Sequence, residues 1–350
     1  MPAGCRRYGN YAGRMQAVRV GQRALALRRF YRKYYMGKRK RKKGKRNPVK
    51  DWIGYAALRV GLFILLRFSV KANLRFARFL GSQMWKHYER GRMRAMDNLR
   101  RSFPEKDEKW CAETGKRSFQ QIVMLVIDIF YTSKLVNRDN WQKYTRYKNI
   151  EQLKWLMQGG QGVLMLTAHY GNFEIMGYML GLFGFNLYSI ARPIDNPYIN
   201  RYLLGLRRHT GQKIIDKKGA TDKMEQIIAE HASIGFIADQ DAGKKGVFVD
   251  FFGKKASTYK SIGLLAIQYD MPIVVASSKR VGDDFFFEIE VHRIIFPDEW
   301  KDKDDPLTWI TQEYVKATED FIRQDPTQYW WLHRRWKHQP KERKVRGEKQ

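Results

Sequence analysis

Cysteine is scarce in this chain of 350 residues, which holds only Cys5 and Cys111. Two distant thiols provide neither a disulfide framework nor the spacing of a metal site, and this favours a reducing compartment. The basic N-terminal stretch is followed by no uninterrupted apolar run within the first 30 residues, so no secretory signal peptide is expected. Basic residues also interrupt every candidate for a clean membrane-spanning helix, which needs about 20 mostly apolar residues.

Two common catalytic motifs are absent as well. The sequence has no G-x-S-x-G nucleophile elbow and no phosphate-binding P-loop. Chemistry through an activated serine or cysteine nucleophile is therefore not indicated.

Acidic residues are few relative to basic ones, with 35 Asp and Glu against 67 Lys and Arg and a net charge of +32. Residues 1–50 hold 18 of the basic residues and no acidic one. We expect this segment to be a disordered basic arm, and residues 341–350 to be a basic tail. Such charge predicts an anionic partner, which can be a lipid headgroup, a nucleic acid or an acidic protein.

Residues 51–150 are expected to form a helical, membrane-associated region. The segment 52–82 is rich in Trp, Phe, Leu and Ile, and its cationic residues include Arg67, Lys71, Arg75 and Arg78, which recur at helical spacing. This pattern is typical of a basic amphipathic segment that lies in a membrane surface. The alternative is a core helix packed on a catalytic domain. Further along, Pro104 is expected to separate two helices.

The remainder of the chain, residues 151–340, alternates between short apolar runs and amphipathic stretches. The apolar runs predict strands at Gly162–Thr167, Leu187–Ala191, Ile234–Ala238, Pro272–Ser277 and Phe285–Val291. Helices are predicted over residues 149–158, 172–182, 196–210, 221–231, 259–269 and 306–324. This alternation favours an α/β core with a mixed, largely parallel sheet flanked by helices.

The segment TAHYGNFE, residues 167–174, places a histidine and a carboxylate around a tight turn. It follows the apolar run Val163–Leu166, so His169 lies at the end of a strand, where open α/β sheets present active-site residues. We expect Glu174 to hold one imidazole nitrogen protonated and to leave the other free as a general base. A surface pair at a turn is the alternative. Without a serine or cysteine nucleophile, the pair favours attack of a substrate hydroxyl on a carbonyl.

TAHYGNFE resembles the H-x4-E motif of the lysophospholipid acyltransferase superfamily, in the H-x-G-N-[WF]-E form of the lipid A biosynthesis acyltransferases. Further blocks over about residues 55–340 resemble the same family in the same order. They are Asn98-Leu99 with Ser102-Phe103-Pro104, Arg192-Pro193, Asp239-Gln240 with Gly246–Val249 and Phe251–Gly253, Ala266 with Pro272–Val274, and Tyr329–Trp336. The long basic arm is the main departure from the family pattern.

The resemblance implies a fold of the glycerol-3-phosphate-acyltransferase type behind a helical membrane-associating region. It also implies transfer of a fatty acyl group from an acyl carrier protein or coenzyme A thioester to a hydroxyl of a lipid A precursor of the Kdo-lipid IVA type. The implied catalytic residues are His169 and Glu174, and the implied substrate-binding residues are Gly171, Asn172, Arg192, Asp239, Gln240 and Gly253. A structural salt bridge is the alternative for Arg192, and a structural role is the alternative for Asp239. No metal and no bound cofactor are implied.

The expected partners are a membrane lipid acceptor, an acyl carrier protein or acyl-coenzyme A, and an anionic membrane surface at the cytoplasmic face of the inner membrane. Three alternatives remain open. The acceptor can be another glycolipid, such as a phosphatidylinositol mannoside, or the chain can be a membrane protein that has lost activity. A nucleic-acid-binding protein would explain the charge, but it would not explain the strand–histidine–helix unit.

Overall fold

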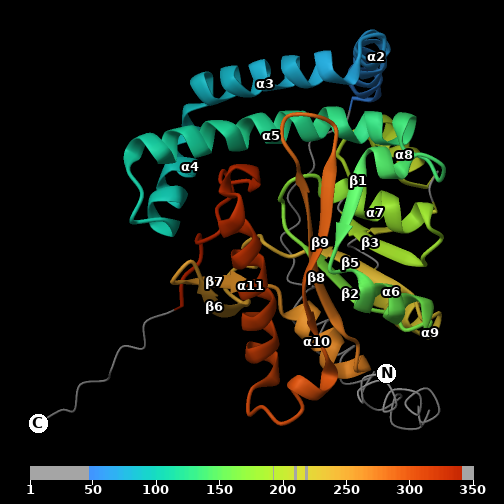
Figure 1. Cartoon of the computed structure of the whole chain (residues 1–350), viewed down its shortest axis with the longest axis vertical. Helices are drawn as coiled ribbons and strands as arrows, with labels where there is room; N and C mark the ends of the chain where they lie inside the picture. The colour runs from blue at the N-terminus through green and yellow to red at the C-terminus, as the bar shows by residue number, and fades with distance from the viewer. Residues whose placement is uncertain (1–46, 192, 209–210, 217–219, 341–350) are drawn as a thin grey trace, which may run out of the picture. The chain divides into compact units, whose positions relative to one another are not determined.

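The computed structural model describes residues 47–191, 193–208, 211–216 and 220–340 (Figure 1). Most of the predicted basic arm, and the predicted basic tail from residue 341, lie outside the described residues. Residues from Lys50 onward cluster into one compact unit.

A seven-stranded sheet forms the centre of this unit, in the order β1-β9-β8-β2-β5-β3-β4. All neighbouring strands pair parallel except β8 and β9, which are antiparallel. The predicted mixed, largely parallel sheet is therefore confirmed. The strands are β1 (Thr145–Lys148), β2 (Leu164–Thr167), β3 (Leu187–Ala191), β4 (Lys213–Asp216), β5 (Ser233–Ile237), β8 (Ile273–Arg280) and β9 (Phe287–Ile295).

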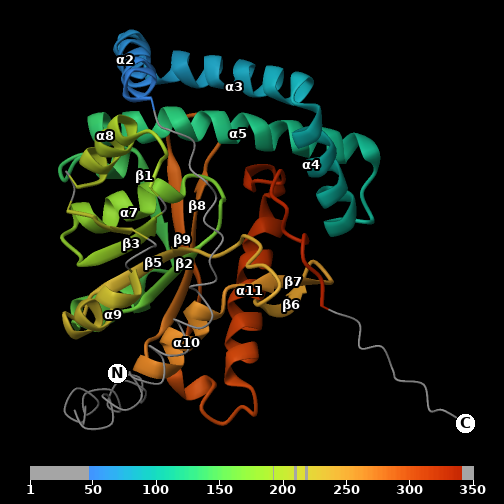
Figure 2. The ribbon, with the colours of Figure 1, turned by 180° about the vertical axis from the view of Figure 1, so that it is seen from behind.

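Helices cover both faces of the sheet, as Figures 1 and 2 show from opposite sides. Alternate residues of β2 explain the two layers, because Leu164 and Leu166 belong to one buried cluster and Val163 and Met165 to the other. The first cluster includes residues of α9 (Ala220–Ala229), α10 (Lys260–Tyr269) and α11 (Pro306–Gln324). The second includes residues of α5 (Glu108–Leu135), α6 (Glu151–Gln158) and α7 (Phe173–Leu182). The remaining α-helices are α2 (Pro48–Leu65), α3 (Val70–His87), α4 (Glu89–Ser102) and α8 (Pro197–Arg208).

The predicted helices of the second half agree with the observed ones to within two residues at each end. Their ends have ordinary chemical causes. Asp305 accepts a hydrogen bond from the backbone of Thr308 and Pro306 occupies the first turn, so α11 begins there. In the first half, Asp107 caps α5 in the same way after the break at Pro104.

The N-terminal helices α2 and α3 lie on the outside of α5 (Figure 1). Helix α3 buries Leu74, Ala77 and Gly81 along one side, and a Cβ at Gly81 would stand 2.5 Å from the backbone of Gln120 in α5. Leu62 is the one buried residue of α2. This region therefore packs on the core along a single face and leaves large apolar side chains exposed. Within the described part of the chain, no helix has the length and apolarity needed to cross a membrane.

One expectation about the division of the chain is wrong, and strand β4 and a two-stranded hairpin were not predicted. Strand β1 lies within the region predicted to be helical, residues 51–150, yet it pairs with β9 in the sheet, so the α/β core begins before residue 151. The segment after β5 was not predicted as strand, but it forms the hairpin β6 (Val247–Phe251) and β7 (Lys254–Thr258) outside the main sheet. Four-residue edge strands and short hairpins give little periodicity from which to predict them.

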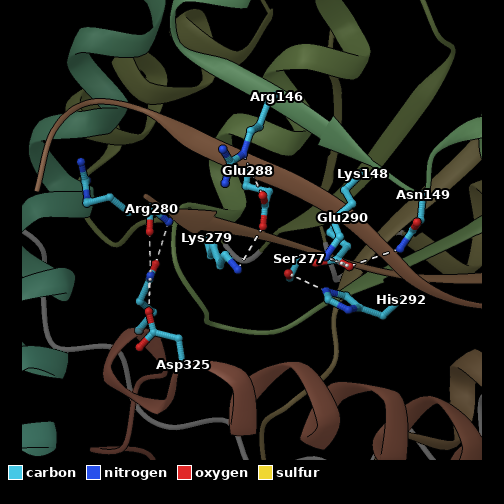
Figure 3. A network of polar contacts seen from close by, with 11 residues as sticks. Arg146, Lys148, Asn149, Ser277, Lys279, Arg280, Glu288, Glu290, His292 and Asp325 are labelled. Carbon is cyan, nitrogen blue, oxygen red and sulfur yellow. Dashed lines mark hydrogen bonds and ion pairs between the residues drawn. The ribbon is translucent and has the colours of Figure 1, made fainter. Parts of the chain in front are cut away.

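A ladder of ion pairs links β1, β8 and β9 on one face of the sheet (Figure 3). Glu288 contacts Arg146 at 2.7 Å and Lys279 at 3.0 Å, and Glu290 contacts Lys148 at 3.1 Å. The two carboxylates are more than nine-tenths buried, and a buried charge is tolerated only when it is paired. These contacts account for the charged residues of β1 and β9 without a substrate.

Candidate active site

Strands β2 and β5 bring a histidine and an aspartate to the same edge of the sheet. The two strands are parallel, and Thr167 is the register partner of Ile237. His169 and Asp239 each lie two residues beyond this pair, and the amide of Ala238 still donates to the carbonyl of Thr167 at 2.9 Å. Because the register continues past the last strand residues, the two side chains stand at the same level although 70 positions separate them.

Nδ1 of His169 and Oδ1 of Asp239 are 2.8 Å apart. The Asp239 side chain is fully buried, whereas that of His169 remains 15% exposed. Burial by itself raises the pKa of Asp239, but the His169 ring and its hydrogen bonds outweigh burial and hold that pKa well below its usual range. An ionised Asp239 keeps the proton on Nδ1 of the neutral imidazole, so Nε2 carries the free electron pair. A ring in this form can accept a proton at Nε2.

The expected contact between Glu174 and His169 is wrong. Glu174 lies in the first turn of α7, and both of its oxygens contact Arg207 of α8, at 2.5 and 3.0 Å. The helix directs this carboxylate toward α8, while Nδ1 of His169 is taken by Asp239. Glu174 is close to His169 in the sequence, but the register of β2 with β5 places Asp239 closer to its ring.

Gly171 and Asn172 shape the turn after His169. Gly171 has φ of +52°, and a Cβ there would stand 2.0 Å from the carbonyl oxygen of Ser278, so no other residue fits. The Asn172 side chain caps α7 by accepting from the backbone of Ile175 at 3.0 Å. Backbone geometry explains both residues, and their expected substrate binding stays a prediction.

The C-terminal block Tyr329–Trp336 packs directly against the histidine. Tyr170 and Tyr329 form an antiparallel bridge, and the amide of Trp330 donates to the carbonyl of His169 at 3.1 Å. The ring of His333 lies 4.8 Å from that of His169, centre to centre. The sequence predicted that the aromatic and basic residues of this block suit a membrane interface or nucleic-acid stacking, and it predicted no catalytic role for His333. Only the fold places its ring beside the base.

Burial lowers the pKa of His333 to about 4, despite the opposing influence of Asp239. Its imidazole is therefore neutral at neutral pH. The amide nitrogen of Gln240 lies 3.5 Å from Nε2 of His169 and 3.5 Å from Nδ1 of His333, so Gln240 stands between the two rings. The predicted site residues Asp239 and Gln240 are thus both at the histidine.

Asn98 anchors the C-terminal block from helix α4. Its amide donates to the carbonyl oxygens of Trp331 at 2.6 Å and His333 at 2.8 Å. Phe103 packs edge-on against the Trp331 ring and against Phe252. The segment that contains Asn98 and Phe103 therefore anchors the C-terminal block that carries His333.

Of the other two predicted substrate residues, the structure describes only Gly253. Arg192 lies outside the described residues. Gly253, with φ of +68°, forms the turn of the β6–β7 hairpin together with Phe252, whose φ of +52° is unusual for a bulky residue. Phe252 is buried in the aromatic cluster with Phe103, so a turn requirement explains Gly253 and its substrate role stays a prediction.

Among the described residues, His169, Asp239 and His333 form a group of the donor types that zinc binds, with ligand atoms within 4.8 Å of one another. Direct hydroxyl attack with a histidine base requires no such ion. The expectation of no metal and no cofactor stays a prediction.

Two apolar cavities are lined in part by residues of α7, and His169 is not among the lining residues of either. The smaller, about 90 Å³, is lined by Thr167, Phe173 and Glu174 near the turn and by residues of β3 and β5. The larger, about 440 Å³, reaches toward Trp141 and α6, with Lys154 and Gln158 among its lining. Both are bounded by Met165, Met176 and Leu180, which therefore separate them.

Comparison with known proteins identifies a matching family and several relatives. A family model described as bacterial lipid A biosynthesis acyltransferase matches residues 39–338. A lipid A biosynthesis acyltransferase of Haemophilus influenzae is 20% identical over 80% of this chain and 85% of its own length. The lipid A biosynthesis lauroyltransferase of Escherichia coli K12 is 23% identical over 69% of this chain and 78% of its own.

Among solved structures, the 1-acyl-sn-glycerophosphate acyltransferase of Thermotoga maritima aligns with a TM-score of 0.34 and 11% identity, over 71% of this chain and 94% of that one. The family model covers most of the chain, including the histidine, the aspartate and the C-terminal block. The chain is an acyltransferase and belongs to the bacterial lipid A biosynthesis acyltransferase family.

Proposed function

We propose that this acyltransferase moves a fatty acyl group from an acyl carrier protein or coenzyme A thioester directly to a hydroxyl of a phosphorylated lipid A precursor of the Kdo-lipid IVA type. The observation that carries the proposal is the 2.8 Å contact between His169 and the buried Asp239. It leaves Nε2 as a base on His169, whose side chain is 15% exposed while that of Asp239 is fully buried.

The reaction needs no acyl-enzyme. His169 takes the proton of the acceptor hydroxyl at Nε2 while the hydroxyl oxygen attacks the thioester carbonyl carbon. Asp239 orients the ring and stabilises the imidazolium that forms, as the carboxylate of a triad does. The imidazolium then gives its proton to the departing sulfur.

The apolar cavities supply room for the acyl chain of the donor. Phe173, which lines the smaller one, has its ring 5.3 Å from that of His169, centre to centre. The larger cavity, of about 440 Å³, falls in the range of about 300–1,000 Å³ that is usual for small-molecule sites. A chain entering beside Phe173 would displace the buried side chains of Met165 and Met176 to reach it, and methionine adapts readily to such changes.

The exposed apolar residues of α2 and α3 suit a membrane surface. They include Trp52, Phe63, Phe76 and Phe79, each more than half exposed. Cationic residues lie among them, which favours anionic headgroups. We place the enzyme on the cytoplasmic face of the inner membrane, bound by these helices.

A thin-layer assay tests the proposal. Radiolabelled Kdo-lipid IVA-type acceptor and, in a parallel reaction, a radiolabelled phosphatidylinositol mannoside are incubated with acyl carrier protein and coenzyme A thioesters of several chain lengths, with wild type and His169→Ala. We expect acylated product with wild type and a loss of at least about 10³-fold with His169→Ala. Product formed only on a phosphatidylinositol mannoside would move the enzyme to another acceptor class. Near-wild-type turnover by His169→Ala would refute the assignment of the base.

A further inference from the structure

Gln240 lies on the side of His169 where the reaction would take place. Its amide nitrogen is 3.5 Å from Nε2 of His169, the nitrogen that would remove the proton. The same amide nitrogen is 3.5 Å from Nδ1 of His333. One side chain thus contacts the base and a second histidine at once.

The orientation of this amide follows from the protonation of the two rings. Nδ1–H of His169 is directed at Asp239, so its Nε2 can only accept. His333 is neutral, because burial lowers its pKa to about 4, and its Nδ1 can therefore accept as well. In the His333 tautomer that carries its proton on Nε2, two acceptors face Gln240, and the NH2 group and not the carbonyl oxygen is directed toward them. At 3.5 Å these bonds exceed the usual 2.7–3.2 Å, so a substrate can replace the one to His169.

His333 is held in place by several contacts that leave its ring little freedom. It stacks on Trp330 with 17° between the ring planes and 5.6 Å between their centres. Its amide donates to the carbonyl of Trp330 at 3.2 Å, and its own carbonyl accepts from Asn98 at 2.8 Å. The ring that faces Gln240 is therefore fixed from two elements.

Given the proposed acyl transfer, we propose that Gln240 is a catalytic residue that donates a hydrogen bond to the oxyanion, and that His333 is the positioning residue that holds its amide for this task. As the hydroxyl oxygen bonds to the thioester carbon, its proton passes to Nε2 of His169 and the carbonyl π electrons pass to the carbonyl oxygen. That oxygen forms next to the hydroxyl, within reach of an amide that stood beside Nε2. When the carbonyl is restored, the thiolate leaves and takes the proton from Nε2. Gln240 transfers no proton and acts only as a donor.

A double-mutant cycle in the acyl-transfer assay tests this assignment. Gln240→Ala is expected to lower kcat by about 10²–10³-fold, the usual effect of losing one oxyanion donor, with KM changed less than about threefold. His333→Phe is expected to lower kcat at least about tenfold. The double variant should be no more than about threefold slower than Gln240→Ala, because His333 acts through the amide. If the losses of kcat in the two single variants multiply in the double variant, His333 does not act through Gln240 and the positioning role is overturned. If the kcat of Gln240→Ala is within threefold of wild type, the donor role is overturned.

Two further variants separate positioning from structure. His333→Asn keeps an acceptor for the amide of Gln240, so its kcat should be close to that of wild type, unlike the kcat of His333→Phe. The comparison holds when the two variants have equal melting temperatures. Equal losses of kcat in the two variants would contradict the proposal. Gln339→Ala removes contacts to Lys255 and Trp336 in the same C-terminal segment and should leave kcat unchanged. If wild type acylates none of the acceptors, the proposed function fails and this inference fails with it. An additive cycle in an active wild type overturns this inference alone.

Discussion

Replacement of Asp239 by asparagine is the sharpest test of which carboxylate serves His169. The change keeps the size of the buried side chain and removes its charge. With 2.8 Å between Nδ1 and Oδ1 and an effective dielectric constant of about 20, the imidazolium and the carboxylate attract by about 6 kcal/mol. That energy equals about four decades in rate, which agrees with the loss of about 10⁴ in kcat on a similar replacement in a serine protease triad.

We expect Asp239→Asn to lower kcat by about 10³–10⁴-fold with a small change in KM. Glu174→Gln should lower kcat less than about tenfold, because it weakens a partly exposed pair with Arg207 that does not touch the base. Initial rates at saturating acceptor, measured for both variants in the same preparation series, give the comparison. Circular dichroism melting checks that each variant is folded.

The opposite order of effects would refute the reasoning. If Glu174→Gln lost three decades and Asp239→Asn less than one, the carboxylate that serves His169 during turnover would be Glu174. The pair seen here would then be a resting arrangement. Equal losses in both variants, with a double variant no worse than either, would mean that the two carboxylates act as one unit.

Three further predictions concern stability, chain length and membrane binding. The pKa of His333 is about 4 in the folded state and about 6.5 in the unfolded state, so its contribution to stability is present above pH 6.5 and is lost as the pH falls toward 4. Between pH 7.5 and 4.5, the free energy of unfolding measured in urea should therefore fall by about 2.5 kcal/mol more in wild type than in His333→Asn. Met157→Trp fills part of the larger cavity and should shift the preferred thioester to shorter chains, by about fourfold in kcat/KM for each excluded methylene, in a competition assay with mixed thioesters. Phe63→Asp with Phe79→Asp should weaken sedimentation with anionic vesicles by at least about tenfold, because these side chains are more than half exposed on α2 and α3.

Each of these has a matched control. An unchanged pH dependence in His333→Asn would assign the acid lability to other groups. Met93→Trp, at an exposed methionine that lines neither cavity, should leave the chain-length profile as in wild type, and an equal shift there would dismiss the cavity. Gln161→Asp with Gln324→Asp, at two exposed residues outside α2 and α3, also changes the charge by two without touching the apolar surface, so equal loss of vesicle binding would point to net charge alone.

The sequence was sufficient for the local features of the site. The apolar run, the histidine, the glycine of the turn and the following helix are all encoded by neighbouring residues. Strand β2, the turn and α7 therefore form as predicted. Asp239 was likewise placed at a strand end by the run before it. Strands β1, β4, β6 and β7 were not predicted. Strands β1 and β4 are four residues long and include charged residues, which leaves little apolar run to detect. Strand β6 does contain an apolar run, Val247–Val249, but that run was assigned only to a family block and not to a strand.

Contacts between distant segments were decided only by the tertiary structure. The sequence placed a base at the end of β2 and two carboxylates in range, but the choice between Glu174 and Asp239 depended on strand register and helix phase. The register of β2 with β5 brings Asp239 to the ring, while the first turn of α7 directs Glu174 to Arg207. The position of His333 beside His169 depends on the antiparallel bridge between Tyr170 and Tyr329, two residues that are 159 positions apart in the chain. Residue spacing along a chain fixes local periodicity, whereas pairing between strands and segments is set by the packing of the whole core.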